Sequence, residues 1–396
     1  MTVQPLDLPK YEILGEIGHG GMATVYRARD RRLGREVALK VIHRHLRENA
    51  EVGRRFAGEA LAVAKVNHPN IVEVYDVSGE EEEEQYLVVE LIEGCTLREL
   101  LTRRGPLPSE VAACIAVEVS RALAQAHRQG IVHRDVKPEN VLLRLGDEEG
   151  KDDVARVKLT DFGIAKLLDA QGVTCTGQVL GSPAHMAPEQ IEGGDVDARS
   201  DVFGVGVLLY EMLTGSLPFE GKNPAQVLRR VLEGTFVPAE RARSEVGFRY
   251  GQIVGRALAH RAEDRYATAT LLADDLEAEL ARLGIAQVRA EISKYLRDPE
   301  KYVEEHRQSI PDRLAERANE ARSAGDFVRS AGDFNRALAY RPDDTVLLGE
   351  VAGLATRGRR LRRLKKLGWA GLGLLGVVIL GSGVACGVSR LRTPTP

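Results

Sequence analysis

Two acidic side chains and one amide stand beside apolar stretches of the chain, where they could meet at one site. Asp135 and Asn140 lie in the polar run VHRDVKPENVLL (residues 132–143), which apolar residues bracket. Asp161 follows the apolar residues of KLTDFG. Carboxylate and amide oxygens suit Mg²⁺, which proteins usually hold with one or two carboxylates and the phosphates of a substrate. The pattern therefore predicts a loop site for magnesium and a phosphate compound.

A glycine cluster lies upstream of these residues. Residues 18–26 read GHGGMATVY, with Ile17 and Val25 as apolar flanks. A loop of this kind can bring backbone amides close to a phosphate, but it is also typical of a tight β-hairpin turn. The cluster alone leaves both interpretations open.

A lysine lies inside the apolar stretch that follows. Residues 37–42 read VALKVI, which is typical of a strand, and Lys40 is the one charge among them. The next segment, RRFAGEALAVAKV (residues 54–66), has helical apolar spacing, and it places Glu59 where its carboxylate could reach Lys40. A surface salt bridge of little energetic weight is the alternative for this pair.

Six motifs in this order resemble the signature set of protein kinases: GxGGMATVY, VALK, Glu59, HRDVKPEN, DFG and MAPE (residues 186–189). The residues of these motifs are similar to those of the bacterial eukaryotic-like, or Hanks-type, serine/threonine kinases. The resemblance covers residues 11–283. It implies an α+β, two-lobed protein-kinase fold, with a β-rich N-lobe, a larger helical C-lobe and ATP between them.

The resemblance also implies a set of ATP-binding residues. The glycine loop would cover the phosphates, Ile17 and Val25 would enclose adenine, and Glu90 to Ile92 would form the hinge strand. Ala23 replaces a regularly spaced glycine, and because alanine disfavours positive φ, a modest shift in ATP affinity is expected. The implied nucleotide-binding residues are Ile17, Gly18, His19, Gly20, Gly21, Met22, Ala23, Thr24, Val25, Lys40, Glu59, Glu90 and Ile92.

The resemblance to protein kinases also implies catalytic and metal-binding residues. By the resemblance, Lys40 would neutralise the α- and β-phosphates, while Asn140 and Asp161 would hold Mg²⁺, with Mn²⁺ as an alternative ion. Asp135 would accept the proton of the substrate hydroxyl. Lys137 would add positive charge near the γ-phosphate, and its place after the Asp indicates the serine/threonine subclass. The implied catalytic residues are Asp135, Lys137 and Asn140.

The segment from Asp161 to Glu189 carries two candidate phosphorylation sites. Thr174 and Thr176 lie in a polar stretch, where a phosphate would add about two negative charges for Arg134 to pair with. A solvated loop threonine is the alternative for each.

Three further residues match structural positions of the family. Glu189 and Arg265 match a buried ion pair, and Asp201 matches the residue that braces the catalytic loop. His185 stands where tyrosine is common before MAPE, in the region that would dock the substrate peptide.

Composition excludes several classes of protein. The chain has 396 residues, which predicts two or three parts, and its net charge of −3 provides no basic field for nucleic acid. The four cysteines lie far apart, so neither a disulfide framework nor a zinc site is predicted, and a reducing compartment is favoured. The first ten residues lack the apolar core of a secretory signal.

The region 284–356 is charged and helix-favouring. The segment contains one unit that resembles a tetratricopeptide repeat. A single repeat cannot bury its own core, so this unit would pack on a flanking helix such as 346–354 or on the kinase lobe. A module that docks a partner peptide and a plain spacer are both open. Five residues fall where a tetratricopeptide helix pair keeps its turn glycine, packing aromatics, small residue and terminal proline: Gly325, Phe327, Phe334, Ala337 and Pro342.

Residues 367–388 contain no charged side chain and predict one transmembrane helix. As a helix they would extend about 33 Å, enough to cross a bilayer. A basic run at 357–366 precedes them, so the positive-inside bias predicts that the kinase faces the cytoplasm from the plasma (inner) membrane. A hydrophobic surface anchor is the alternative. Gly383 and Gly387 form a GxxxG pair that could join two helices into a homodimer.

The sequence therefore predicts a membrane-anchored, cytoplasmic serine/threonine kinase that transfers the γ-phosphoryl of MgATP to proteins and phosphorylates its own activation loop. A pseudokinase scaffold is one alternative, although the retained catalytic residues argue against it. A kinase-fold enzyme for small molecules is another, although the GSP (residues 181–183) and MAPE elements favour a protein acceptor. The predicted parts are a tail (1–10), the kinase domain (11–283), the helical segment (284–356), the basic segment (357–366), the span (367–388) and a short external tail (389–396).

Overall fold

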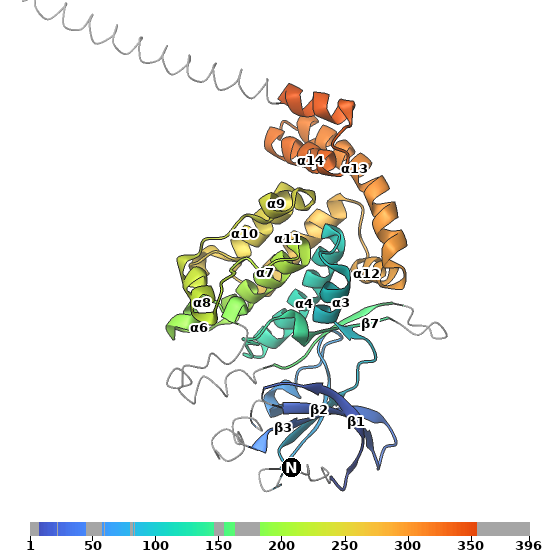
Figure 1. Ribbon diagram of the computed structural model, residues 1–396, viewed down its shortest axis with the longest axis vertical. Coiled ribbons are helices and arrows are strands. Elements are labelled where there is room, and N and C mark those ends of the chain that lie inside the picture. The colour runs from blue at the N-terminus through green and yellow to red at the C-terminus, as the bar shows by residue number, and fades with distance from the viewer. Residues whose placement is uncertain are drawn as a thin grey trace, which may run out of the picture. The chain divides into compact units, whose positions relative to one another are not determined.

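The computed structural model of the chain describes residues 8–21, 23–44, 58, 60–79, 82, 84–145, 154–162 and 183–354. It divides into two compact units, Met1–Arg313 and Leu314–Pro396. The first unit has the predicted two-lobed α+β architecture, with the blue strands in one lobe and the green and yellow helices in the other (Figure 1).

The N-terminal lobe is built on an antiparallel sheet whose strand order is β1-β2-β3-β5-β4. Pairing of β2 with β3 places Val25 opposite Lys40, so the lysine lies in the centre of the sheet. Apolar side chains such as Leu39 and Val88 form a buried cluster within this lobe. The predicted helix over 54–66 is described at residues 60–63. The strands are β1 (Tyr11–His19), β2 (Ala23–Asp30), β3 (Glu36–Ile42), β4 (Val74–Val77) and β5 (Tyr86–Glu90).

The second lobe is organised around two buried helices, α4 (Ser109–Arg128) and α7 (Ala198–Thr214). Both are buried along nearly their whole length, as expected for helices at the centre of a lobe. They pack on each other, and α11 packs on both. The other helices of the lobe are α3 (Leu97–Arg104), α6 (Pro188–Glu192), α8 (Pro224–Glu233), α9 (Ala239–Ala242), α10 (Gly247–Ala257) and α11 (Ala269–Arg282), with the 3₁₀ turns η1 (Pro138–Asn140), η3 (Pro183–His185), η4 (Ser244–Val246) and η5 (Ala262–Asp264).

A second, three-stranded sheet carries the two polar loops of interest. Its order is β6-β7-β8, formed by β6 (Cys95–Thr96), β7 (Val141–Arg144) and β8 (Arg156–Leu159). Pairing of β7 with β8 sets Val141 opposite Leu159. The start of β7 and the end of β8 therefore lie side by side, which brings η1 next to Thr160, the residue before Asp161.

The region after residue 283 is helical, as predicted. It contains α12 (Val288–Arg297), α13 (Pro299–Ser323), α14 (Phe327–Tyr340) and a helical stretch at 345–354. The division between the two compact units falls inside α13, after Arg313. The first unit thus extends beyond the predicted domain boundary at Leu283, because α12 and the start of α13 share its core.

The second unit contains the residues of the predicted repeat. Gly325 adopts φ of +82° in the turn before α14, a conformation that favours glycine, and Phe334 and Ala337 are buried. The prediction that Phe327 packs in the core is wrong, because it begins α14 with 41% of its surface exposed. The helical stretch at 345–354 contributes Glu350, which pairs with Arg322 of α13.

Several predicted features lie outside the described residues: Met22, Glu59, Thr174, Thr176, the basic run 357–366 and the span 367–388. Within the described part of the chain, no helix is both long and apolar enough to cross a bilayer.

Gly204 sets the distance between α7 and the loop that carries Asp135. A methyl group added at Gly204 would lie 2.9 Å from Cβ of buried Val136. We expect Gly204→Ala to lower the free energy of unfolding by about 1–3 kcal/mol, because overpacking outweighs the gain in helix propensity. Urea unfolding followed by near-UV circular dichroism measures the change.

The matched control is Gly255→Ala in α10, where an added methyl group meets open space. This substitution should be neutral or stabilise the protein by up to about 1 kcal/mol. Equal stability of the two variants would contradict the close packing of α7 on the loop.

Candidate active site

The three predicted catalytic residues lie together at η1. Lys137 Nζ donates to Asp135 Oδ2 at 2.5 Å. Asn140 Nδ2 donates to the backbone oxygen of Asp135 at 2.8 Å and to its Oδ2 at 3.1 Å. Pro138 begins the 3₁₀ turn, where a missing N–H costs nothing. The Asp135 carboxylate is thus held by a cation and an amide from its own loop.

Asp161 joins this group from the end of β8. The amide of Thr160 donates to the Asn140 carbonyl at 3.0 Å, which ties the two loops together. Lys40 crosses from the other lobe, and its Nζ lies 2.9 Å from Asp161 Oδ1. Burial opposes ionisation of Asp161, but Lys40 outweighs it and holds the pKa of the carboxyl below its ordinary value. The predicted partner of Lys40, Glu59, lies outside the described residues.

The donor atoms at this place fit Mg²⁺. The side-chain amide nitrogen of Asn140 is occupied by Asp135, so its side-chain oxygen, Oδ1, is the atom left for a cation. Asp161, whose pKa Lys40 holds below the ordinary value, would contribute a carboxylate oxygen. Hard oxygen ligands of this kind are those that Mg²⁺ prefers, with the remaining positions taken by water and phosphate.

Asp201 of α7 braces the loop, as predicted. Its carboxylate is 1% exposed and accepts the backbone N–H groups of His133 at 2.8 Å and Arg134 at 2.7 Å. His127 Nε2 lies 2.7 Å from Oδ2 of the same carboxylate. Arg134 has φ of +67°, a conformation that costs free energy in a residue other than glycine. The bonds to Asp201 hold the backbone in that conformation.

The role of His133 was not predicted from the sequence, although its place directly before Arg134 and Asp135 was a signal. Its Nδ1 accepts the N–H of Asp135 at 3.2 Å, so the ring proton is on Nε2, which donates to the Thr160 carbonyl at 2.8 Å. The ring also packs on Phe162, with centroids 4.5 Å apart. His133 therefore joins the catalytic loop to the DFG residues.

The glycine loop lies between β1 and β2. Gly18 pairs with Val25 and His19 with Thr24, and the Gly20 amide donates to the Ala23 carbonyl at 3.0 Å. Ala23 lies in β2 and does not have positive φ. The alanine therefore carries no backbone strain here, because this position does not need the conformation that glycine permits. The expected shift in ATP affinity stays a prediction.

The predicted hinge begins at the end of β5. The strand stops at Glu90, so the expectation of a strand through Ile92 is wrong. The Glu90 carboxylate accepts from Lys158 Nζ at 2.5 Å, and the same ammonium donates to the Ile71 carbonyl at 3.2 Å. The sequence did not predict this contact of Lys158 with Glu90. The Glu90 amide donates to the Glu73 carbonyl at 2.9 Å, so the side chain and the backbone N–H of Glu90 are both held.

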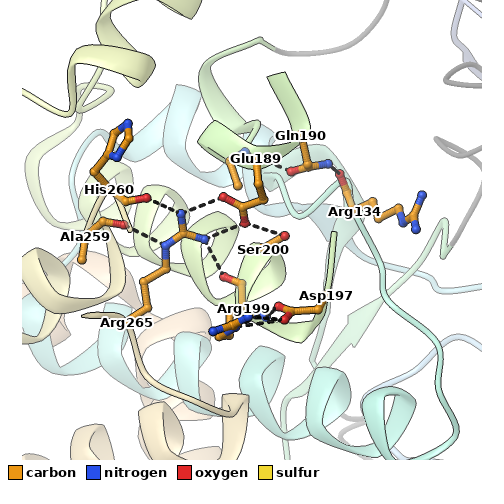
Figure 2. A network of polar contacts seen from close by, with 10 residues as sticks. Arg134, Glu189, Gln190, Asp197, Arg199, Ser200, Ala259, His260 and Arg265 are labelled. Carbon is orange, nitrogen blue, oxygen red and sulfur yellow. Dashed lines mark hydrogen bonds and ion pairs between the residues drawn. The ribbon is translucent and has the colours of Figure 1, made fainter. Parts of the chain in front are cut away.

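The predicted ion pair between Glu189 and Arg265 is present (Figure 2). Arg265 Nη1 and Nη2 donate to the two carboxylate oxygens at 2.7 and 2.8 Å. Ser200 Oγ donates to the same carboxylate at 2.6 Å. Burial opposes ionisation of Glu189, but Arg265 and Ser200 outweigh it, and its pKa is below the ordinary value. Arg265 also donates to the carbonyls of Ala259, Arg199 and His260.

Gln190 links this ion pair to the catalytic loop. Its Nε2 donates to the Arg134 carbonyl at 3.0 Å, and its Oε1 accepts the Ala187 amide at 2.9 Å. In Figure 2 the Arg134 side chain points away from the Glu189 cluster.

His185 lies in a buried charged cluster. Its Nε2 is 3.6 Å from Glu211 Oε2, and Arg98 donates to the other oxygen of Glu211 at 2.5 Å. Burial opposes ionisation of Glu211, but His185 and Arg98 outweigh it and lower the pKa. Arg98 also donates to Glu139 of η1 at 2.7 Å. The residue that replaces the usual tyrosine is therefore connected to the catalytic loop.

Removal of the Arg265 side chain should destabilise the protein strongly. The guanidinium is fully buried, so Arg265→Ala leaves the Glu189 carboxylate and three carbonyls without their partner. We expect a loss of about 3–5 kcal/mol in the free energy of unfolding, measured with urea.

A surface pair provides the control. Arg229 is 80% exposed and pairs with Glu233 one turn along α8. Arg229→Ala should cost about 0–1 kcal/mol. If Arg265→Ala were equally mild, the ion pair would not be the support that its geometry indicates.

Comparison with known proteins identifies the family. The model of the protein kinase domain matches residues 11–275. A probable serine/threonine-protein kinase of Clostridium perfringens is 40% identical over 268 residues, which cover 68% of this chain and 38% of that protein. Serine/threonine-protein kinase PknL of Mycobacterium tuberculosis is 41% identical over 280 residues, which cover 71% of this chain and 68% of PknL.

A solved structure has the same fold. The crystal structure of the Mycobacterium tuberculosis PknI kinase domain aligns with a TM-score of 0.55 and 25% identity, over 69% of this chain and 98% of that one. The region that the family model matches, residues 11–275, contains the loop, strand and ion-pair residues described above. The chain therefore belongs to the protein kinase family, and these curated relatives within the family are serine/threonine-protein kinases.

Proposed function

We propose that the chain transfers the γ-phosphoryl group of MgATP to serine and threonine hydroxyls of proteins. The observation that carries this proposal is the junction of the two loops. Asp135, Lys137 and Asn140 contact one another, and the Asn140 carbonyl holds the residue before Asp161. This brings a base, a cation and two metal-ligand candidates to one place.

Each residue of the junction has a physical role in the proposal. Asp135 accepts the proton of the attacking hydroxyl, and Lys137, 2.5 Å away, supplies positive charge beside it. Lys40 binds the α- and β-phosphates, in place of its present contact with Asp161. Asp161 and the side-chain Oδ1 of Asn140 would hold Mg²⁺, which when bound would neutralise charge on the phosphates.

Two features of the site favour an active kinase over a scaffold. The contacts of Asp135 with Lys137 and Asn140 orient a carboxylate that binding alone does not need. In addition, β3 has a lysine, Lys40, at a partly buried position, where an uncharged residue would pack at lower cost. These contacts support phosphoryl transfer.

We also propose self-activation through the loop that contains Thr174 and Thr176. A phosphate at either residue adds negative charge that Arg134 can pair with. The Arg134 backbone is fixed by Asp201 and Gln190, so such a pair would act directly on the catalytic loop.

We propose, finally, a cytoplasmic kinase anchored in the plasma membrane by residues 367–388. The uncharged span and the basic run 357–366 support this arrangement. The GxxxG pair supports association of two chains through the span. The α13–α14 helix pair, with Gly325 in its turn, supports a tetratricopeptide-like segment that docks a protein partner.

The catalytic proposal predicts a large effect of one isosteric substitution. The full chain and Asp135→Asn are incubated with labelled ATP and Mg²⁺, and phosphate is mapped by mass spectrometry. We expect wild type to carry label on Thr174 or Thr176, and the variant to lose activity by about a hundredfold or more, because the base is removed.

The control is Asp274→Asn, an isosteric change of an exposed residue on α11, which should leave activity unchanged. Binding of ATP by wild type without any transfer, in detergent and in lipid, would favour the scaffold instead.

The anchor proposal predicts that charge within the span releases the chain from membranes. Each arginine at the centre of a span costs about 2.5–3.5 kcal/mol on insertion scales. We expect the double variant Leu374→Arg, Val378→Arg to be lost from the carbonate-washed membrane fraction, and the neutral control Leu374→Ile, Val378→Leu to be retained. Equal retention of both variants would rule out a span at this place.

A further inference from the structure

Helix α12 lies beyond the residues that match the kinase family model, yet it is part of the core of the first unit. Val288, Ile292 and Tyr295 are buried in the same apolar cluster as α4. The helix packs against α4. Its position is therefore fixed relative to the lobe that carries β8.

Arg289 of α12 binds a buried pair of polar side chains. Its Nε donates to Glu118 Oε2 at 2.8 Å, and its Nη2 donates to Asn70 Oδ1 at 3.3 Å. Asn70 Nδ2 donates to the same Glu118 oxygen at 2.6 Å. Glu118 is completely buried and Asn70 is 2% exposed. Because a buried carboxylate needs charged partners, Glu118 holds both Arg289 and Arg121, which donates to its other oxygen at 3.1 Å.

Asn70 in turn holds β8. Its Nδ2 also donates to the Val157 carbonyl at 2.8 Å, and the Leu159 amide donates to the Asn70 carbonyl at 2.8 Å. Both the side chain and the backbone of Asn70 are thus bonded to the strand. The second of these bonds lies two residues before Asp161.

Ser293 of α12 holds the other end of β8. Its Oγ accepts the amide of Ala155, the residue before the strand, at 2.6 Å. The same hydroxyl donates to the Arg289 carbonyl at 2.9 Å, one turn back in the helix. Ser293 is 5% exposed. One helix therefore contacts β8 at its start directly and near its end through Asn70.

We infer that α12 positions the strand that presents Asp161, with Arg289 and Ser293 as its positioning residues. Asp161 has φ of +65°, a conformation that persists only where surrounding structure holds it. The contacts from α12 fix the strand that leads into this conformation. The inference deepens the proposed kinase function: it adds to the catalytic unit a helix that follows the family's domain.

The first test measures the strand itself. Amide hydrogen exchange of the peptide covering 154–162 is compared in the full wild-type chain, Arg289→Ala and Ser293→Ala. We expect about tenfold faster exchange in both variants, because local opening of β8 becomes easier. The control is Lys294→Ala, an exposed residue of α12 whose partner, Glu291, is on the same helix, and it should exchange like wild type.

The second test measures the site. Binding of Mn²⁺ with a non-hydrolysable ATP analogue is followed by electron paramagnetic resonance, and kcat and KM for a protein substrate are measured alongside. We expect Arg289→Ala to weaken metal binding and lower kcat by about three- to tenfold each, with KM for the substrate unchanged. Arg289→Lys, which keeps the charge near Glu118, should recover part of the loss.

Two results would overturn the inference. One is normal exchange of 154–162 and normal metal binding in both alanine variants. The other is a lower melting temperature with unchanged exchange, metal binding and kcat, which would make Arg289 merely structural. If wild type transferred no phosphate at all, the proposed function would fail, while the exchange and Mn²⁺ measurements would still decide the role of α12.

Discussion

The site depends on the hydrogen bonds that the buried carboxylate of Asp201 accepts from the catalytic loop. A loop that carries Asp135, Lys137 and Asn140 presents polar groups, so apolar packing alone cannot fix it. Asp201 solves this because it lies on α7, a helix buried along nearly its whole length, and accepts two successive backbone amides of the loop. The left-handed conformation of Arg134 is tolerated because these charge-assisted bonds offset its cost.

The two sides of the site are held in different ways. On the helical side, backbone and ring bonds join the loop to the DFG residues, through Asn140 to Thr160 and His133 to Thr160. On the other side, Lys40 reaches Asp161 by a single flexible side chain. The catalytic loop and metal-ligand candidates are therefore preorganised, whereas the contact of the phosphate-binding lysine can change as nucleotide binds.

The sequence was most informative where the chemistry uses neighbouring residues. Asp135, Lys137 and Asn140 lie within one short run, and Lys40 lies inside a recognisable strand, so motif and spacing predicted their places. The pairs of Glu90 with Lys158 and of Arg289 with Asn70 were missed, because residues so far apart in the chain leave no local pattern. Phe327 was predicted to pack in a core because its position matches an aromatic position of the tetratricopeptide repeat. A match of positions does not tell which face of a helix its neighbour covers.

The C-terminal boundary of the catalytic unit lies further along the chain when it is judged from buried contacts than when it is judged from motifs. The family model ends at residue 275, but two fully buried carboxylates of α4 have partners beyond it. Glu118 binds Arg289, and Glu110 Oε2 lies 2.6 Å from His306 Nε2 on α13. Because desolvated carboxylates are costly unless paired, a chain cut at the motif boundary would lose these partners while keeping both carboxylates. The physical unit of this kinase therefore runs to Arg313, and α12 and the first part of α13 belong to its core.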